Sequence, residues 1–401
     1  MDKEELKRNI IEYVKDAVKY YKFEEYEKAM ELYLKASKGL YSLSNKEENV
    51  YSKRIYIEKA KEYCSRVRKI REDALEEMRL QKELNDFIVK KKQRVKWDDI
   101  VGLEEAKEIL KEATIYPKKF PQLFKGKRKP WKTILLYGPP HTGKSHLVKA
   151  VVTETKYYFI SISFSKIINE MKEEPNIFIK DVFFLARKNE PSIIFFDEVD
   201  RICSSETDID YIKRIEIEFR IQIENTFKSD ENILIIGATN NPWELNPIFR
   251  KIFQKKIYIS LPRINERKDL FDKYLKDIPN TLTEEQKEDI VKRTDWFSAH
   301  DIITLIKDAN LEQTKKCKDT EYFKKIPGIN ENTWNYVPCQ KNEEDAIKMI
   351  FSEIPDPKDL LPPKAIYEDF IVLLKKMNGN CINQNDYDKY EEFTIEFGQE
   401  G

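Results

Sequence analysis

The sequence predicts a multidomain protein. An all-α N-terminal three-helix bundle is followed by an α/β domain with a parallel sheet, and then by a helical domain that contains a small β insertion. The 401 residues are enough for two or three domains that each bury a core. Helix-forming residues dominate from residue 8 to about 74, where there is no proline and Gly39 is the only glycine. After Trp97, short β-rich runs alternate with helical patterns, which indicates parallel strands joined by crossover helices.

Charge, cysteine content and hydropathy exclude several classes of protein. Lys plus Arg and Asp plus Glu both number 72, so no net charge draws the chain to nucleic acid or to a membrane surface. The five cysteines form no CxxC pair, which argues against a zinc site and a disulfide framework. No run approaches the roughly 20 apolar residues of a membrane helix. We therefore expect a cytoplasmic protein without a nucleic-acid partner.

Three apolar stripes predict the helices of the N-terminal bundle, which we assign to residues 1–76. Each stripe repeats at helical spacing, and the breaks near residues 22–25 and 42–49 allow antiparallel packing. The grooves of such a bundle can accept an amphipathic partner helix. The stripes are Ile11, Val14, Val18 and Tyr21; Ala29, Leu32, Tyr33, Ala36 and Leu40; and Tyr56, Ala60, Tyr63, Val67 and Ile70. A charged segment, residues 77–95, is predicted to be a linker.

The α/β domain is assigned to residues 96–262. Its predicted strands are residues 134–137, 158–162, 193–196, 233–236 and 257–259. A helical pattern continues through residues 263–322, and a proline-punctuated stretch with short strands predicts a β insertion at 323–362. Residues 363–401 are predicted to be helices that complete the helical subdomain.

The first of the predicted strands is followed directly by a phosphate-loop motif. The sequence GPPHTGKS fits GxxxxGK[ST] and opens a helix near Lys144. In this motif the backbone N–H groups hold phosphates, the lysine reaches the β and γ oxygens, and the serine, here Ser145, binds Mg²⁺. We therefore predict that ATP and Mg²⁺ bind to Gly138, Pro139, Pro140, His141, Thr142, Gly143, Lys144, Ser145 and His146.

Two further strands end in residues suited to ATP hydrolysis. Asp197 and Glu198 follow an apolar run, which places both carboxylates at the carboxyl edge of the sheet, beside the loop. Asp197 is predicted to hold Mg²⁺, and Glu198 to activate the attacking water. Asn240 ends the next run, where its amide can hydrogen-bond the γ-phosphate or the water.

Five stretches between residues 97 and 262 resemble the meiotic clade of AAA ATPases: WDDIVGLEEAKEIL, GPPHTGKS, FFDEVD, GATNNPWEL and IYISLP. Over nearly its whole length the chain resembles the vacuolar protein sorting-associated protein 4 family, whose members use ATP to disassemble ESCRT-III filaments. The segment YEKAMELYLKA, residues 26–36, is similar to the microtubule-interacting and trafficking (MIT) domain of that family. The ending, residues 396–401, matches the family's terminus.

This resemblance implies a ring-shaped homo-hexamer that acts in endosomal sorting and membrane scission. The MIT bundle would bind the tails of ESCRT-III subunits, with Tyr63, Cys64 and Val67 in the partner groove. A cofactor protein would dock on the β insertion. Recruitment to endosomal membranes would then occur only through partners.

Several positions depart from the family pattern. His141 replaces a glycine of the phosphate loop, and Ala299 and His300 replace a Gly-Ala pair at a helix start that we interpret as a structural cap. Where relatives have consecutive arginines that reach a neighbour's γ-phosphate, this chain has Arg250, Lys251 and Ile252, so Arg250 is the candidate arginine finger. The candidate pore-loop residues are Met171 and Lys172, in place of an aromatic pair.

Two alternative functions are compatible with the sequence. One is microtubule severing of the katanin or spastin type, which shares the ATPase block, although the terminal segment argues against it. The other is an ATP-binding scaffold with little hydrolysis, because both the arginine finger and the pore loop are altered.

Overall fold

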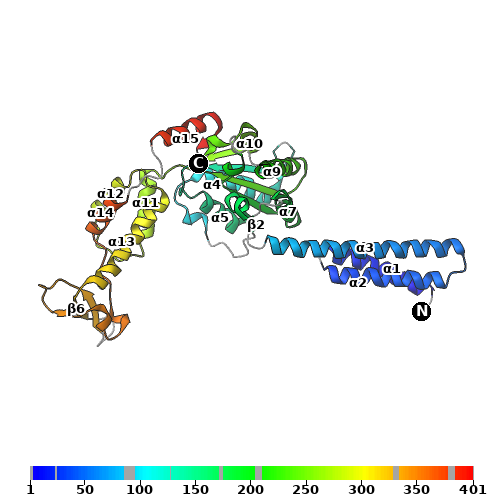
Figure 1. The fold of residues 1–401 in the computed structure, drawn as a ribbon, viewed down its shortest axis with the longest axis horizontal. Coiled ribbons are helices and arrows are strands. Elements are labelled where there is room, and N and C mark those ends of the chain that lie inside the picture. The colour runs from blue at the N-terminus through cyan, green and yellow to red at the C-terminus, as the bar shows by residue number, and fades with distance from the viewer. Residues whose placement is uncertain are drawn as a thin grey trace. The chain divides into compact units, whose positions relative to one another are not determined.

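The computed structural model describes residues 3–22, 25–84, 95–126, 128–170, 175–203, 210–327, 334–377 and 384–400. The chain forms two compact units, Met1–Ile88 and Val89–Gly401 (Figure 1). The predicted fold class is confirmed: N-terminal helices, an α/β core with a parallel sheet, and a helical region with a small antiparallel sheet. Among the described helices, none combines the length and the apolarity that crossing a bilayer demands.

The first unit is a bundle of three helices: α1 (Lys3–Lys22), α2 (Tyr26–Asn45) and α3 (Val50–Glu83). The stripes predicted on α2 and α3 lie in its core, where Ala29, Ala36 and Ala60 are fully buried. Helix α3 runs beyond the expected bundle boundary at residue 76, and most of the expected linker, residues 85–94, lies outside the described residues.

The stripe predicted on α1 is wrong by one position. Ile11 is 57% exposed, and the buried residues of α1 are instead Leu6, Ile10 and Ala17. The reason lies in α2, where the space left by the missing side chain of Gly39 is filled by Ile10: a Cβ at Gly39 would meet Ile10 Cγ1 at 2.8 Å. This close approach fixes the rotation of α1 about its axis.

The α/β core is a parallel six-stranded sheet with the order β2-β3-β4-β1-β5-β9. The strands are β1 (Thr133–Tyr137), β2 (Tyr158–Ser163), β3 (Ser192–Asp197), β4 (Ile233–Thr239), β5 (Lys255–Tyr258) and β9 (Gln399–Glu400). All residues of β1 and β4 are buried, as expected of strands covered on both faces. The carboxyl ends of the strands therefore share one edge of the sheet.

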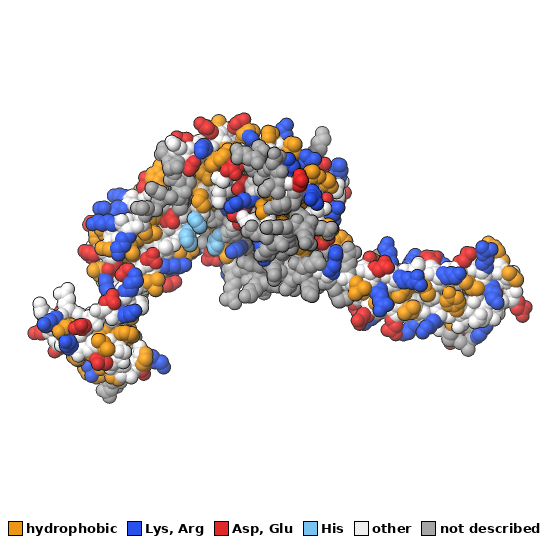
Figure 2. Space-filling view, in the orientation of Figure 1, with side chains coloured by type: hydrophobic (Ala, Val, Ile, Leu, Met, Phe, Trp, Pro, Cys, Tyr) orange, Lys and Arg blue, Asp and Glu red, His pale blue; other side chains and the backbone are white. Residues whose placement is uncertain are grey.

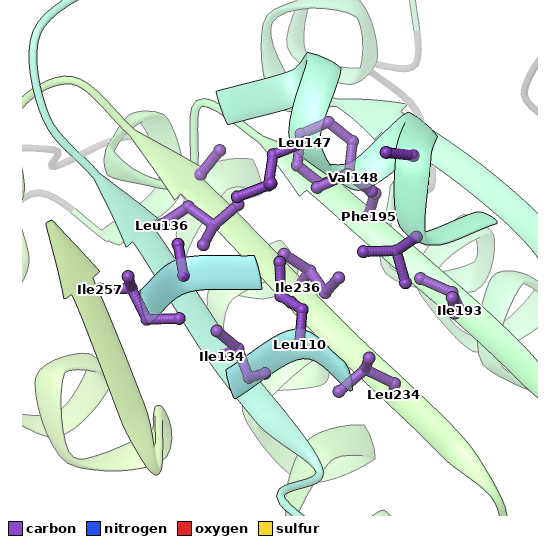
Figure 3. Packing of buried hydrophobic residues seen from close by; sticks show 14 of the residues in the cluster. Leu110, Ile134, Leu136, Leu147, Val148, Ile193, Phe195, Leu234, Ile236 and Ile257 are labelled. Carbon is purple, nitrogen blue, oxygen red and sulfur yellow. The ribbon is translucent and has the colours of Figure 1, made fainter. Parts of the chain in front are cut away.

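Each face of the sheet packs against different helices. On one face, Leu110 of α4 (Glu104–Lys119) and Leu147 of α5 (Lys144–Thr155) pack on Leu136 and Ile236 (Figure 3). The other face is rich in phenylalanine, with Phe196 of β3 next to Phe219, their ring centroids 4.7 Å apart. The helices near this face and its loops are α6 (Phe164–Glu170), α7 (Pro175–Lys188), α8 (Asp200–Cys203), α9 (Asp210–Lys228) and α10 (Pro247–Ile252).

A helical subdomain follows the sheet. Its core is formed by α11 (Ile264–Leu275), α12 (Glu284–Arg293), α13 (Ala299–Asp319) and α14 (Tyr367–Lys376). Between α13 and α14 the chain forms an antiparallel sheet with the order β7-β6-β8, made of Trp334–Pro338, Tyr322–Pro327 and Ala346–Lys348.

The C-terminal segment serves both parts of the second unit. Of the residues 363–401 expected in the helical subdomain, α14 packs there, whereas α15 (Gln384–Phe397) packs on the α/β core. Tyr390 and Phe393 of α15 join Tyr137 and Tyr258 in an aromatic cluster, and β9 pairs with β5. The chain therefore returns to the sheet from which the helical subdomain departs.

Candidate nucleotide site

The phosphate loop lies between β1 and α5, in the strand–loop–helix context that the sequence predicted. Gly138 has a φ of +145°, and a Cβ there would lie 2.2 Å from the carbonyl oxygen of Ile259, so only glycine fits. Gly143, with a φ of +104°, directly precedes α5. His141 also has a positive φ, of 63°, although it carries a side chain.

Lys144 is buried within this loop. Its Nζ donates hydrogen bonds to the carbonyl oxygens of Gly138, at 2.8 Å, and Pro139, at 2.7 Å. Burial lowers its pKa from 10.5 to about 8, against the opposing effect of Asp197 and Asp200. The ammonium group therefore has little solvation, and phosphate oxygens would supply the negative charge that stabilises it.

Ser145 and Asp197 come together as predicted for a Mg²⁺ site. Ser145 Oγ donates to Asp197 Oδ2 at 3.2 Å, and the backbone N–H of Glu198 donates to Asp197 Oδ1 at 3.0 Å. Burial raises the pKa of Asp197. A hydroxyl and a carboxylate at this separation are the oxygen ligands that Mg²⁺ prefers, so the residues present fit the cation.

Glu198 is held next to this pair by a strained backbone and a side-chain contact. Its φ is 57°, in the left-handed region. Ser163, at the end of β2, donates its hydroxyl to Glu198 Oε2 at 3.0 Å. Strained conformations of this kind persist only where the surrounding structure holds them, and they are concentrated at functional sites.

The end of β4 completes the edge of the sheet. Thr239 Oγ1 donates to Asp200 Oδ1 at 2.5 Å. Asn240, the next residue, lines the same cavity as Lys144 and Asp197. The carbonyl oxygen of Asn240 accepts a hydrogen bond from the Tyr390 hydroxyl. Ser163, Asp200 and Tyr390 were not predicted from the sequence. Ser163 could have been found, because it ends the strand next to β3 at the same edge of the sheet.

The side chains described above that line a common cavity include Lys144, Ser145, Ser163, Asp197, Glu198 and Asn240. The cavity has a volume of about 770 Å³, which is within the usual range for a small-molecule site. Its walls come from both the α/β core and the helical subdomain. Ile100, Val101 and Leu103 provide apolar surface from the core, and Leu270, Tyr274, Ala299 and Ile303 provide it from α11 and α13. The chain has three histidines, and His141, His146 and His300 all line this cavity.

Arg250, the candidate finger, is not among the residues that line the cavity of its own chain. Its Nε donates to the carbonyl oxygen of Leu245 at 2.7 Å, and its guanidinium carbon lies 5.1 Å from the ring centroid of Phe397. Lys251 is exposed. The candidate pore residues Met171 and Lys172 lie outside the described residues.

The residues predicted for the partner groove are largely inside the bundle. Tyr63 is 9% exposed and packs on Tyr33, with ring centroids 5.7 Å apart. Cys64 Sγ lies 3.2 Å from Ser37 Oγ, and Val67 is half-buried. Most of their surface is therefore used in the packing of α3 on α2.

Comparison with known proteins connects this geometry to a family. Residues 134–261 match the ATPase family associated with various cellular activities (AAA), and residues 336–398 match the Vps4 C terminal oligomerisation domain. The chain is 39% identical over 340 residues to vacuolar protein sorting-associated protein 4B of Mus musculus, covering 82% of this chain and 76% of that protein. It is 34% identical over 437 residues to SUPPRESSOR OF K(+) TRANSPORT GROWTH DEFECT 1 of Arabidopsis thaliana, covering 98% and 99%.

Solved structures are similar to the second unit in fold. The FIGL-1 AAA domain in complex with ADP superimposes with a TM-score of 0.64 at 27% identity, covering 80% of this chain and 97% of that one. A katanin structure superimposes with a TM-score of 0.59 at 24% identity, covering 78% and 95%, a likeness of fold alone.

Proposed function

Because this chain belongs to the Vps4 family of AAA ATPases, we propose that Lys144, Asp197 and Glu198 are the residues with which it hydrolyses ATP. Family membership makes the protein a nucleotide-binding ATPase of ESCRT-III disassembly and endosomal sorting. The observation that supports the assignment of residues is the contact of Ser145 with Asp197 beside the buried ammonium group of Lys144.

Each residue has one task in the proposed reaction. The loop N–H groups and Lys144 bind the phosphates, and Ser145 and Asp197 would hold Mg²⁺, which neutralises charge on the phosphate oxygens when bound. Glu198 accepts a proton from the attacking water, and the hydroxyl of Ser163 orients its carboxylate. The amide of Asn240 fixes the water or the γ-phosphate. The water oxygen bonds to the γ-phosphorus as the bond from that phosphorus to the bridging oxygen breaks. The proton passes from Glu198 to the phosphate, and ADP and phosphate leave.

Steady-state hydrolysis of Mg–ATP, measured against protein concentration, tests this assignment. Glu198→Gln should lower kcat by about 10²-fold or more while ADP affinity is kept, because only proton transfer is removed. Glu285→Gln is the matched control, since Glu285 is an exposed carboxylate in the first turn of α12, away from the cavity. Equal rates for the native chain and Glu198→Gln would reject the role of Glu198.

The partner interactions are proposed at a finer level than family membership gives. The protein assembles into oligomers and acts with ESCRT-III and cofactor proteins, as the family does. We assign a hexameric ring, binding of ESCRT-III tails by the α1–α3 bundle, and docking of a cofactor protein on the β6–β8 sheet. Tail binding would bring the protein to endosomal membranes. Preformed ESCRT-III filaments that stay intact with the protein and ATP would contradict this assignment.

Two alternatives remain measurable in the same preparation. Microtubule severing has weaker support, because katanin is similar in fold alone, whereas the 34% identity to the Arabidopsis protein covers nearly all of both chains. Shortening of tubulin filaments would favour it. A weakly hydrolysing scaffold is favoured by the single arginine of the 250–252 segment, and vigorous turnover would exclude it.

A further inference from the structure

Two histidines from different parts of the second unit stack on each other at the nucleotide cavity. His141 belongs to the phosphate loop, and His300 is the second residue of α13. Their ring centroids are 5.3 Å apart and their planes differ by 26°. Figure 2 shows histidine side chains, in pale blue, side by side on one face of this unit. We propose that His141 and His300 are a positioning pair that holds the helical subdomain against the phosphate loop and thereby strengthens nucleotide binding.

The two walls of the cavity make this contact relevant to affinity. The α/β core supplies the phosphate loop, whereas α11 and α13 supply Tyr274 and Ile303 on the opposite wall. A nucleotide that touches both walls binds only when they face each other. Its apparent dissociation constant is the intrinsic value divided by the fraction of molecules in that arrangement. A contact that raises this fraction lowers the dissociation constant.

Two contacts that α11 makes with the opposite wall lie at a different place from the stack. Lys273 of α11 donates to the carbonyl oxygen of Asp98 at 2.6 Å, and its Nζ is 3.7 Å from Asp99 Oδ1. Gly102 lies against the side chain of Glu266. These contacts join α11 to the segment before α4, whereas the histidine pair joins α13 directly to the phosphate loop.

The backbone of His141 supports a role for its side chain. A φ of 63° is strained for any residue with a Cβ, and glycine would adopt it without cost. Both histidines are exposed, so burial in a core does not explain them. The aromatic contact across the two walls is the interaction that the strained residue makes possible.

Binding of a fluorescent ADP analogue to the full chain tests the pair. His141→Gly and His300→Ala should each raise the dissociation constant about two- to tenfold, the range that an aromatic pair provides. The double variant should bind ADP no more weakly than the single variant with the higher dissociation constant, because both substitutions break the same contact. His300→Phe keeps a ring at this position and should bind like the native chain.

The controls separate this inference from the proposed nucleotide site on which it rests. Lys307→Ala changes an exposed residue of α13 that does not line the cavity, and it should leave the dissociation constant unchanged. A native chain that fails to bind ADP would reject the nucleotide site itself. Three results would each overturn the positioning pair. They are native-like binding by His300→Ala, additive losses of affinity in the double variant, and a loss of affinity in His300→Phe equal to that in His300→Ala.

Discussion

At the scale of single residues, the buried cation of Lys144 affects the stability of the nucleotide-free protein. Its side chain is 7% exposed, and its partners in the loop are two neutral carbonyl groups. Burial favours the uncharged amine, which is why the pKa falls to about 8. In the nucleotide-free protein, the hydrogen bonds to Lys144 therefore replace only part of the solvation that its ammonium group loses on burial.

We expect the stability of the nucleotide-free protein to rise between pH 8 and pH 10.5 relative to Lys144→Met. In this window the folded state binds fewer protons at Lys144 than the unfolded state, whose pKa stays near 10.5, so the free energy of unfolding increases with pH. The gain is at most about 3 kcal/mol. Denaturant unfolding of both chains, below pH 8 and near pH 10, measures it, and an unchanged difference between them would contradict the lowered pKa.

The positions of the candidate site residues were largely predictable from the sequence, but their contacts were not. A motif of fixed spacing placed Lys144 and Ser145. An apolar run that ends in two acids placed Asp197 beside them, because the carboxyl ends of parallel strands share one edge of the sheet. Ser163 is visible in the sequence as a strand end, but its hydrogen bond to Glu198 joins residues 35 positions apart, and no local pattern marks that pairing. The stack of His141 on His300 depends on how two subdomains meet, which spacing does not encode.

At the scale of elements, the start of α13 depends on one buried hydroxyl group. Ser298 is fully buried, its Oγ accepts from the N–H of Asp301 at 3.2 Å, and its backbone N–H donates to Asp301 Oδ2 at 2.8 Å. This capping box satisfies N–H groups that the helix leaves unpaired. It also fixes Ala299 and His300, which line the cavity.

Ser298→Ala is therefore expected to lower the free energy of unfolding by about 1–2 kcal/mol. The loss should exceed that of Thr283→Ala, which removes the equivalent cap of α12 at an exposed position. Denaturant unfolding followed by circular dichroism measures both. Equal losses in the two variants would show that burial of the Ser298 cap adds nothing.

The turn before α13 holds a strained aromatic residue. Trp296 has a φ of 64°, and its ring contacts Tyr387 of α15 edge-on, with centroids 5.2 Å apart. The contact links the helical subdomain to the helix that packs on the sheet. At Trp296 the backbone strain therefore lowers the stability of the fold, whereas the aromatic contact raises it.

Comparison of Trp296→Gly with Trp296→Ala separates these two effects. Both substitutions remove the aromatic contact, but only glycine relieves the left-handed backbone. The glycine variant should therefore be more stable than the alanine variant by about 1 kcal/mol, although alanine is normally the better residue. The free energies of unfolding in urea give the difference, and a more stable alanine variant would show that this φ is not imposed by the fold.

The elements themselves were predictable where their pattern had one solution. Runs such as residues 193–196 are short, apolar throughout and made of isoleucine and phenylalanine, which favours a buried strand over a helix segment. Helix α1 has isoleucine at both positions 10 and 11, and the choice between them was made by Gly39 on another helix. Helix α15 is amphipathic in the same way whether it packs on the helical subdomain or on the sheet, so its sequence did not distinguish the two.

At the scale of the whole molecule, Arg250 is the residue proposed to act on a neighbouring subunit of the ring. The Leu245 carbonyl and the Phe397 ring hold its side chain within its own chain, at the end of α10. It does not line the cavity of that chain. A head-to-tail assembly would give such an arginine a site in the next subunit, because each subunit presents the same surface to the cavity of the subunit that follows it.

Mixing two inactive variants tests whether Arg250 acts on the neighbouring site. Glu198→Gln retains the arginine, and Arg250→Ala retains the catalytic carboxylate, so each alone should hydrolyse little ATP. In an equal mixture, an Arg250→Ala subunit that borders a Glu198→Gln subunit regains a complete site. Random closed rings would contain about a quarter of all sites in that form. Hydrolysis should therefore exceed that of either variant alone.

Lys251→Ala is the matched control and should remain active by itself. No recovery on mixing would mean that Arg250 serves its own chain, through Phe397, and inactive Lys251→Ala would assign the finger to Lys251.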